Sequence, residues 1–157
     1  MRAGIAMPMK LLYAVPFLLL LFGLMGAGLF LATANFGFGG KATYGQMLGV
    51  WFYGMLPLML VSILTIITLY AGADSDSFNL KDPVGTNIGY YLYGGSSPHW
   101  LITLLSSVDV LAIWSAVLLT IGVSTVAGIK LSSAAVVVFG WWGLYVLLQV
   151  AGAAIAG

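Results

Sequence analysis

The sequence has few charged residues for its length. Asp, Glu, Lys and Arg make up 6% of its 157 residues, whereas an ordinary soluble domain carries roughly 25%. Apolar residues make up 62%, and the mean hydropathy is +1.11. Such a chain cannot cover itself with a polar surface, so we predict an integral membrane protein. Its five basic and four acidic residues nearly balance, which leaves no basic face for nucleic acid.

Cysteine is absent and histidine occurs once. The lack of cysteine excludes disulfides, thiolate metal sites and cysteine nucleophiles. The remaining polar residues form no nucleophile and base pair, no HExxH motif and no paired carboxylates of a recognisable catalytic pattern. We therefore expect no catalytic residues, no metal site and no enzymatic activity.

Long apolar runs dominate what is present. Because a membrane-spanning helix needs about 20 predominantly apolar residues, the chain has room for four spans in a single transmembrane domain. The predicted fold class is all-α, a polytopic integral membrane helical bundle with short interfacial or re-entrant helices in one loop. The spans are predicted at about 11–35, 44–71, 107–129 and 133–156, and the interfacial loop at 72–106.

The first run follows the basic residues Arg2 and Lys10. A charged start before an apolar run is also typical of a signal peptide, but signal cores are usually about 7 to 15 residues long and this run is longer. A retained helix is the preferred interpretation. Gly23 and Ala27 lie four residues apart, a spacing that admits a close neighbouring helix.

The second span has a recognisable start and a recognisable bend. Thr43 follows a glycine-rich turn, and Gln46 stands three residues further on, at the spacing of a capping box. Pro57 lies mid-span, where its missing N–H frees a carbonyl group and should kink the helix.

The loop between the second and third spans contains several turn residues. Asp82 precedes Pro83 and should end the preceding structure, because the residue before a proline avoids the helical conformation. Asn87, between two glycines, is expected to fold the chain back.

The same loop is unusually apolar and rich in tyrosine. Residues 84–93 are too short to span and are predicted to form an interfacial or re-entrant helix. Because a solvated loop would be polar, we expect the connection to be an ordered lid that packs on the bundle and presents the surface for a partner.

His99 and Trp100 follow a helix start at Ser97 and Pro98. A lone imidazole can bind a metal or a pigment, but no second protein ligand lies nearby in the sequence, so an interfacial hydrogen-bonding histidine is the preferred interpretation. We expect no cofactor; a lipid or a pigment bound at the surface or near His99 stays an open alternative.

Asp109 is the only acid attached to a long apolar run. A carboxylate inside the membrane would be a functional candidate, but in the first turn of a helix it complements the helix dipole. The cap is the preferred interpretation. Ser106 and Asp109 stand at capping-box spacing, which predicts that a new helix begins there.

The fourth span is predicted to follow a turn at Lys130 with a serine N-cap in 132–133. We expect Gln149 to make an interhelical hydrogen bond worth ~1 kcal/mol rather than a transport site. Trp141 and Trp142 lie near the middle of this span, and their indole N–H groups should find partners between helices.

Four tracts together resemble a known family: 39–44 (GGKATY), 55–57 (MLP), 79–89 (NLKDPVGTNIG) and 104–114 (LLSSVDVLAIW). Their order and spacing resemble the bacterial branch of the Yip-domain family over about residues 18–156. Family members usually have five spans, so the chain resembles a short member lacking the first span. The eukaryotic relatives are Golgi and endoplasmic-reticulum membrane proteins that associate with prenylated Rab-type GTPases. The resemblance implies a membrane fold, a bacterial inner-membrane location and little chemistry.

Two functions follow as hypotheses. The first is a non-enzymatic scaffold or accessory subunit of a larger membrane complex, whose partners are the lipid bilayer and other membrane-protein subunits. The alternative is a carrier or channel component, in which Asp109, Gln149 and the Pro57 kink would line a path, although the paired broken helices typical of transporters are missing.

Charge gives conflicting evidence on orientation. Lys41 and Lys130 fall on one side of the membrane, and Arg2, Lys10 and Lys81 on the other. Counting Lys and Arg favours an inside N-terminus. The family's plan without its first span places Lys41 and Lys130 inside and the C-terminus outside, and we prefer this second arrangement.

Overall fold

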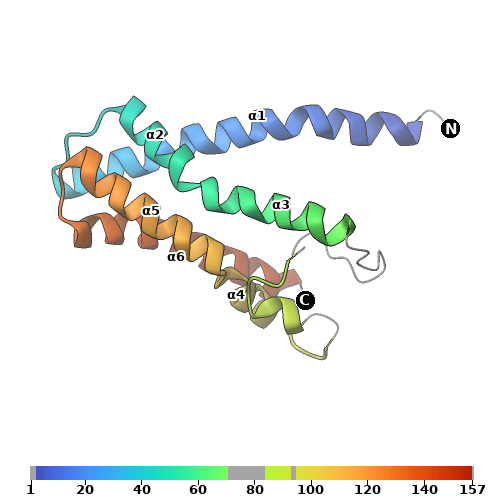
Figure 1. Ribbon diagram of the computed structural model, residues 1–157. Coiled ribbons are helices and arrows are strands. Elements are labelled where there is room, and N and C mark those ends of the chain that lie inside the picture. Colours follow the sequence, from blue (N-terminus) through green and yellow to red (C-terminus); the bar gives the residue numbers. More distant parts are fainter. Residues whose placement is uncertain (1–2, 71–83, 93–94, 157) are drawn as a thin grey trace.

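The computed structural model describes residues 3–70, 84–92 and 95–156, so Asp82 and Pro83 lie outside the described residues. Within these ranges the chain is helical, with no strand beyond one isolated bridge between Asn87 and Asp109. In chain order the elements are α1 (Ala3–Ala32), the π-helical turn η1 (Thr33–Gly37), α2 (Tyr44–Gly54), α3 (Leu56–Tyr70), the 3₁₀ turn η2 (Gly89–Leu92), α4 (His99–Ser107), α5 (Val110–Ala127) and α6 (Leu131–Ala156) (Figure 1).

The described residues include four stretches long and apolar enough to cross a membrane, which confirms the predicted all-α, four-span fold class. They are Pro16–Gly37, Tyr44–Thr68, Val110–Ala127 and Leu131–Ile155. The second stretch combines α2 and α3.

Both helical hairpins turn at the same end of the bundle, here called the closed end, which carries residues 38–43 and 128–130 (Figure 1). Gly39 and Gly128 adopt positive φ angles of 71° and 66°, a conformation that side chains disfavour. The amide of Lys41 donates to the carbonyl of Ala127 at 3.0 Å, so the two turns are hydrogen-bonded to each other.

The hydrophobic core lies next to the closed end. Its buried members come from α1, α2, α5, α6 and the adjoining turns, and its largest fully buried side chains are Met47, Val123 and Val137. Close approach depends on small residues: a Cβ added at Gly26 would lie 2.2 Å from the Trp51 ring, and one at Gly54 would lie 2.4 Å from Leu119. At these two points a large side chain of one helix packs directly on the backbone of its neighbour, and only a small residue there leaves room for it.

The close neighbour predicted beside Gly23 and Ala27 is present. A Cβ at Gly23 would lie 2.9 Å from the ring of Phe52, and Ala27 is fully buried. The indole N–H of Trp141 donates to the hydroxyl of Thr33 at 2.9 Å. This bond joins α6 to η1 and gives one of the two tryptophans the interhelical partner predicted for it.

The predicted capping box and kink are both confirmed. The Thr43 hydroxyl accepts from the amide of Gln46 at 3.4 Å, and the Gln46 side chain accepts from the amide of Thr43 at 2.9 Å. The helix breaks at Met55, between α2 and α3. Pro57 follows this break and has no N–H to restore the helical ladder, so α3 leaves in a new direction.

Two predicted helix starts were wrong. Ser106 is in the last turn of α4 rather than a cap, and α5 begins three residues later than the predicted span because Asp109 itself is the N-cap. α6 begins at Leu131, before the serines proposed as its cap, since the first helical bond runs from Ala134 N–H to the carbonyl of Lys130.

The prediction of an interfacial or re-entrant helix at 84–93 was also wrong, since among the described residues 84–92 only the four-residue turn η2 is helical. Residues 84–88, here called the strap, instead run beside the start of α5, where the amide of Val110 donates to the carbonyl of Thr86 at 3.3 Å. Asn87 begins the turn as predicted, because its side chain accepts from the amide of Tyr90 at 2.9 Å.

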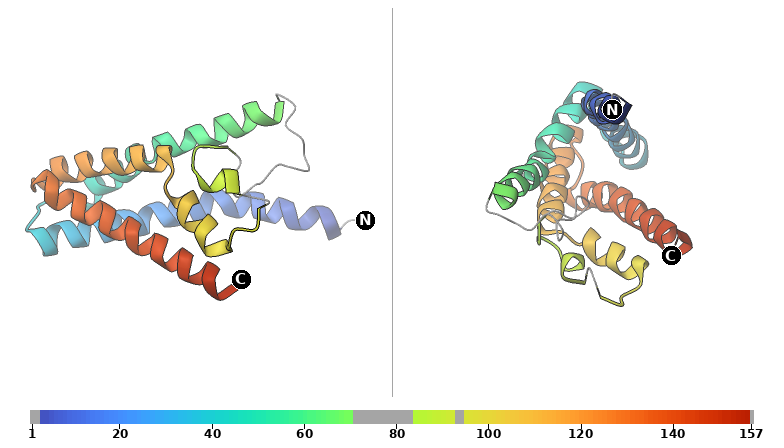
Figure 2. Two further views of the ribbon diagram at one scale, coloured as in Figure 1. Left: turned by 90° about the horizontal axis from the view of Figure 1, so that it is seen from below. Right: turned by 90° about the vertical axis from the view of Figure 1, so that its right-hand side faces the viewer.

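The helices diverge away from the closed end, as the end-on view shows (Figure 2). At this open end α4 packs against α6 and η2, while α1 and α3 lie apart. Large apolar side chains on these diverging helices are exposed, with Phe22 of α1 at 67% and Ile66 of α3 at 55%.

Candidate functional site

A half-open hollow of about 520 Å³ lies at the open end, among α3, α4, α5 and α6. Several polar side chains from different helices converge on this cavity. Its lining residues are Leu58, Thr103, Ser106, Ser107, Asp109, Ala112, Trp142, Tyr145, Val146 and Gln149.

Asp109 provides the charge in this hollow and also caps α5. One carboxylate oxygen accepts from the amides of Leu111 and Ala112 at 2.8 and 3.0 Å, which satisfies two N–H groups at the helix start. The other oxygen accepts from the Thr86 hydroxyl of the strap. The predicted cap is therefore confirmed, and it leaves the carboxylate on the wall of the hollow.

The strap is held tightly against α4 and α5. Asn87 is buried. A Cβ at Gly89 would lie 2.1 Å from the Ser106 hydroxyl and 2.6 Å from its amide, so only glycine fits between η2 and α4. The strap thus fixes α4 beside the first turn of α5, and the hydroxyls of α4 come to face the carboxylate's hollow.

The α4 hydroxyl residues share one helix face. Thr103, Ser106 and Ser107 stand at i, i+3 and i+4, positions that neighbour one another on a helix surface. The Ser107 hydroxyl donates back to the carbonyl of Thr103 at 2.8 Å. Their spacing was the signal that sequence reasoning missed, because Ser106 was interpreted as the start of a new helix.

α6 supplies the opposite wall through Trp142, Tyr145, Val146 and Gln149. The interhelical hydrogen bond predicted for Gln149 is absent from the described residues; its side chain is exposed and faces the hollow instead. The physical reason is that Gln149 lies on an exposed side of α6, although α4 packs against this helix. The partner predicted for Trp142 is likewise not found among the described residues.

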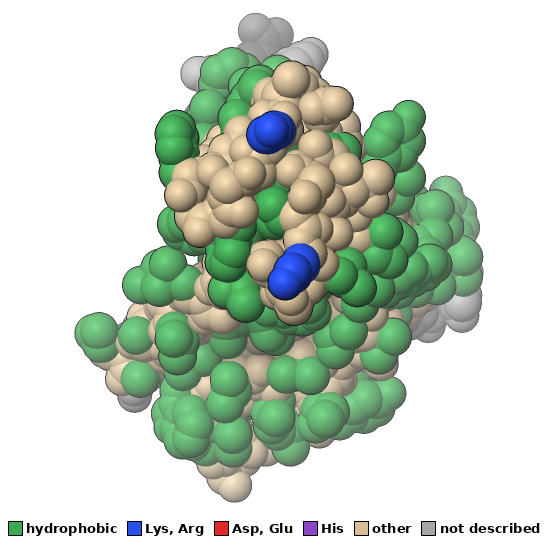
Figure 3. All heavy atoms as spheres, turned by 90° about the vertical axis from the view of Figure 1, so that its left-hand side faces the viewer, with side chains coloured by type: hydrophobic (Ala, Val, Ile, Leu, Met, Phe, Trp, Pro, Cys, Tyr) green, Lys and Arg blue, Asp and Glu red, His purple; other side chains and the backbone are tan. Residues whose placement is uncertain are grey.

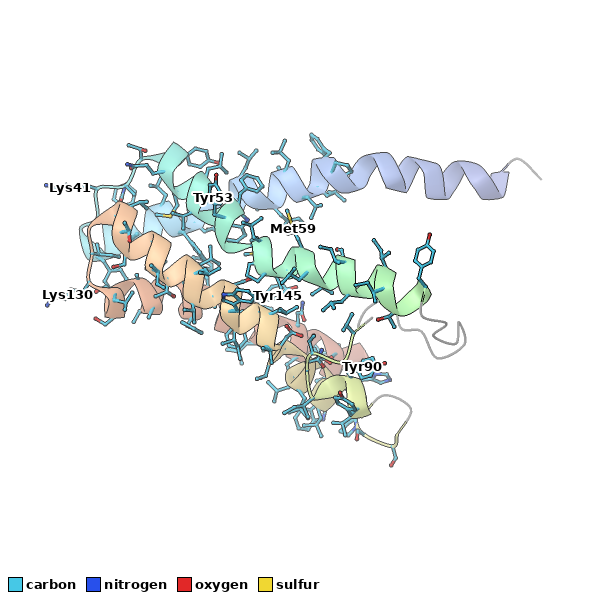
Figure 4. The ribbon with its side chains drawn as sticks, in the orientation of Figure 1. Lys41, Tyr53, Met59, Tyr90, Lys130 and Tyr145 are labelled. Atoms are coloured by element: carbon cyan, nitrogen blue, oxygen red, sulfur yellow. The ribbon has the colours of Figure 1, made fainter. Side chains whose placement is uncertain are left out.

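Two of the five basic side chains lie at the closed end. Lys41 and Lys130 project from the closed end, at the opposite end from Tyr90 of η2 (Figure 4). The space-filling view of the closed end shows these two basic side chains and no acidic one (Figure 3). Asp109 makes no ion pair with any described residue, and the donors to its carboxylate in this part of the chain, Thr86, Leu111 and Ala112, are neutral.

The other predicted site residues lie elsewhere. His99 and Trp100 open α4 and are exposed, outside the hollow's lining. No group of three or more His, Cys, Asp or Glu side chains that could hold a metal occurs within the described ranges. Among the predicted candidates within the described ranges, Asp109 and Gln149 line the hollow together, and Asn87 lies beside Asp109 through the isolated bridge.

The chemistry available in the hollow is binding by charge and hydrogen bonds. Its lining offers one carboxylate, three aliphatic hydroxyls, a phenol, an indole and an amide, set on apolar walls. No imidazole or thiol belongs to this lining to activate a nucleophile. A polar or cationic group of a small ligand fits such a lining.

Comparison with known proteins identifies the fold. A family model described as the Yip1 domain matches residues 2–153. No curated protein and no solved structure matches the chain. The match agrees with the resemblance carried by the four sequence tracts, while the missing first span and the bacterial origin stay predictions. The chain, a multi-pass membrane protein, belongs to the Yip1 domain family.

Proposed function

We propose that this chain is a non-enzymatic scaffold or accessory subunit of a larger complex in the bacterial inner membrane. The observation that carries the proposal is the divergence of α1 and α3 at the open end. Phe22 and Ile66 are more than half exposed on these helices. Close packing rather than hydrophobicity drives helix association in lipid, so helices of another subunit would gain contacts here that lipid chains match poorly.

Site-specific photo-crosslinking in the native membrane tests this proposal. A photoreactive residue at Phe22 or Ile66 is expected to crosslink to a second polypeptide. The matched control is Val136, which is 61% exposed on α6 near the closed end and should crosslink to lipid only. Native purification in mild detergent should show the chain within a larger assembly; a monomer without crosslinks would contradict the proposal.

A solute path through the bundle has less support. Asp109 and Gln149 do line one hollow, but towards the closed end the interior is filled by Met47, Val123 and Val137, each at most 1% exposed. A carrier would have to open this packed core. Flux in liposomes that disappears in Asp109→Asn and Gln149→Leu would revive the carrier.

The proposal also includes an orientation. The family's plan without its first span places the two lysines of the closed end on the cytoplasmic side and the C-terminus outside, although the count of Lys and Arg favours the opposite orientation. We expect activity from a reporter that works only outside the cytoplasm when it is fused after Gly157. An inactive reporter would indicate a cytoplasmic C-terminus and reverse this orientation.

A further inference from the structure

We propose that the hollow at the open end binds the primary ammonium headgroup of a phospholipid such as phosphatidylethanolamine, with Asp109 as the anion. This inference goes beyond the scaffold role and does not depend on it. It starts from the acceptor capacity of the carboxylate. An ionised carboxylate offers about four lone-pair positions, and Asp109 uses three of them, for Leu111, Ala112 and Thr86.

The three donors are neutral, and Asp109 has no ion pair with a described residue. A negative charge close to apolar surroundings is stabilised most by a charged donor, since charge-assisted hydrogen bonds are roughly twice as strong as neutral ones. A primary ammonium group supplies such N–H donors. A trimethylammonium group has the charge without an N–H, and a glycerol headgroup has hydroxyls without the positive charge.

The depth of the hollow matches a headgroup. α5 has 18 residues between Asp109 and the closed end, which is about 27 Å at 1.5 Å per residue. The hydrocarbon core of a bilayer is about 30 Å thick. With Lys41 and Lys130 at one boundary of the membrane, Asp109 lies near the other. Gln149 stands 18 residues beyond Leu131 on α6, at a similar level.

The walls of the hollow suit the rest of a phospholipid. Thr103, Tyr145 and Gln149 offer hydrogen-bond donors that a phosphate can use. Leu58 and Val146 are apolar neighbours for the glycerol region. The hollow is half-open, which leaves room for acyl chains to continue from it into the bilayer. A volume of about 520 Å³ is sufficient for the headgroup.

Lipid binding to the purified full chain tests this assignment. Native mass spectrometry in one detergent would give apparent Kd values for phosphatidylethanolamine, phosphatidylcholine and phosphatidylglycerol with the same acyl chains, and for soluble phosphoethanolamine. We expect the wild-type protein to prefer phosphatidylethanolamine by about tenfold, the scale of one charge-assisted hydrogen bond. Phosphoethanolamine should bind far more weakly because it lacks the acyl chains.

Asp109→Asn is the decisive variant, because asparagine is as good an N-cap as aspartate. The change removes the charge and turns one carboxylate oxygen into an N–H donor, for which the Thr86 hydroxyl can act as acceptor. The preference of this variant for phosphatidylethanolamine should fall to about one. Gln149→Leu, on the opposite wall, should weaken phospholipid binding by about threefold with the preference kept, as expected for one neutral hydrogen bond. Lys130→Gln, at the closed end, should behave as wild type.

Several results would overturn the assignment. If the wild-type protein binds phosphatidylcholine or phosphatidylglycerol as tightly as phosphatidylethanolamine, the hollow does not recognise the primary ammonium group. If Asp109→Asn keeps the preference for phosphatidylethanolamine, the Asp109 carboxylate does not bind the headgroup. Equally tight binding of phosphoethanolamine would show a soluble amine site instead of a lipid site. If Asp109→Asn does not fold, unchanged phospholipid binding in Gln149→Leu would count against the hollow as the location.

Discussion

In the half of this bundle next to the closed end the helices pack through glycines, whereas at the open end they separate around polar side chains. Gly26 and Gly54 admit Trp51 and Leu119 almost to the backbone. Asp109 and Gln149, at the other end, line a cavity instead of filling it. The two ends have similarly apolar helices, so hydrophobicity does not explain the difference. The difference between the two ends comes from side-chain size and from the break in the helix at Met55.

This comparison agrees with the physics of helix association in a bilayer. Lipid chains are as apolar as leucine, so exposure of leucine or phenylalanine to lipid costs little, and close packing decides which helices stay together. The closed end satisfies that condition. The open end does not, which makes it the part of the molecule available to a ligand or to another subunit.

The largest difference in the free energy of unfolding is expected between two variants that each replace one glycine by alanine, one in each half of the bundle. Gly26→Ala places its Cβ 2.2 Å from the Trp51 ring, and we expect a loss of about 1 to 3 kcal/mol in the free energy of unfolding, the usual cost of overpacking. Gly152→Ala, on the open half of α6, meets no atom within 4 Å and should be neutral or slightly stabilising.

Unfolding of both variants in the same detergent, followed by circular dichroism, measures this difference. Because both changes gain the same helix propensity of roughly 1 kcal/mol, the comparison isolates the packing. Equal stability of the two variants would mean that the closed end is not tightly packed.

The next effect concerns the cap that joins the strap to α5. Asp109→Ala removes three accepted hydrogen bonds, and we expect a loss of about 1 to 2 kcal/mol in unfolding free energy, as for other N-cap deletions. Asp109→Asn should retain most of the stability. If the two variants lose the same amount, the carboxylate's charge rather than its capping bonds stabilises this region.

The two adjacent tryptophans of α6 provide a smaller test. Trp141→Phe removes the hydrogen bond to Thr33 and should cost about 0.5 to 1.5 kcal/mol. Trp142→Phe is the matched control, because Trp142 lines the hollow and bonds to no described residue through its indole N–H. A greater loss in Trp142→Phe would place a hidden partner at the open end.

The smallest expected effect is in the strap. The amides of Tyr90 and Val110 donate to Asn87 and Thr86, so in the native membrane they should exchange hydrogen more slowly than in an unstructured peptide. Asn87→Ala should accelerate exchange at Tyr90 while leaving α5 unchanged. If these amides exchange at the rate of an unstructured peptide in the wild-type protein, the connection between the second and third spans is not an ordered lid.

Sequence reasoning succeeded where one local rule was enough. Thr43 and Gln46 form a capping box from residues three apart, and Pro57 bends its own helix through a missing N–H. It failed where two local rules competed. Ser106 stood at capping-box spacing with Asp109, but the hydroxyl face of α4 and the tight fit of Gly89 kept it inside a helix.

The candidate site was only partly predictable for a related reason. Asp109 and Gln149 were recognisable as rare polar residues in apolar runs. That they share one hollow with Thr103 and Tyr145 depends on how far α3 and α6 diverge. No spacing along the chain encodes that divergence.

The sequence by itself determined that the chain enters a membrane, how many times it spans it, and where most helices begin and bend. The physical reason is that a bilayer requires every backbone group to be satisfied within its own segment, so apolar length, caps and proline act locally. Only the tertiary structure decided which end of the bundle closes and which polar groups meet. Those outcomes follow from side-chain packing between helices far apart in the chain, such as Val50 against Gly122 and Trp141 against Thr33.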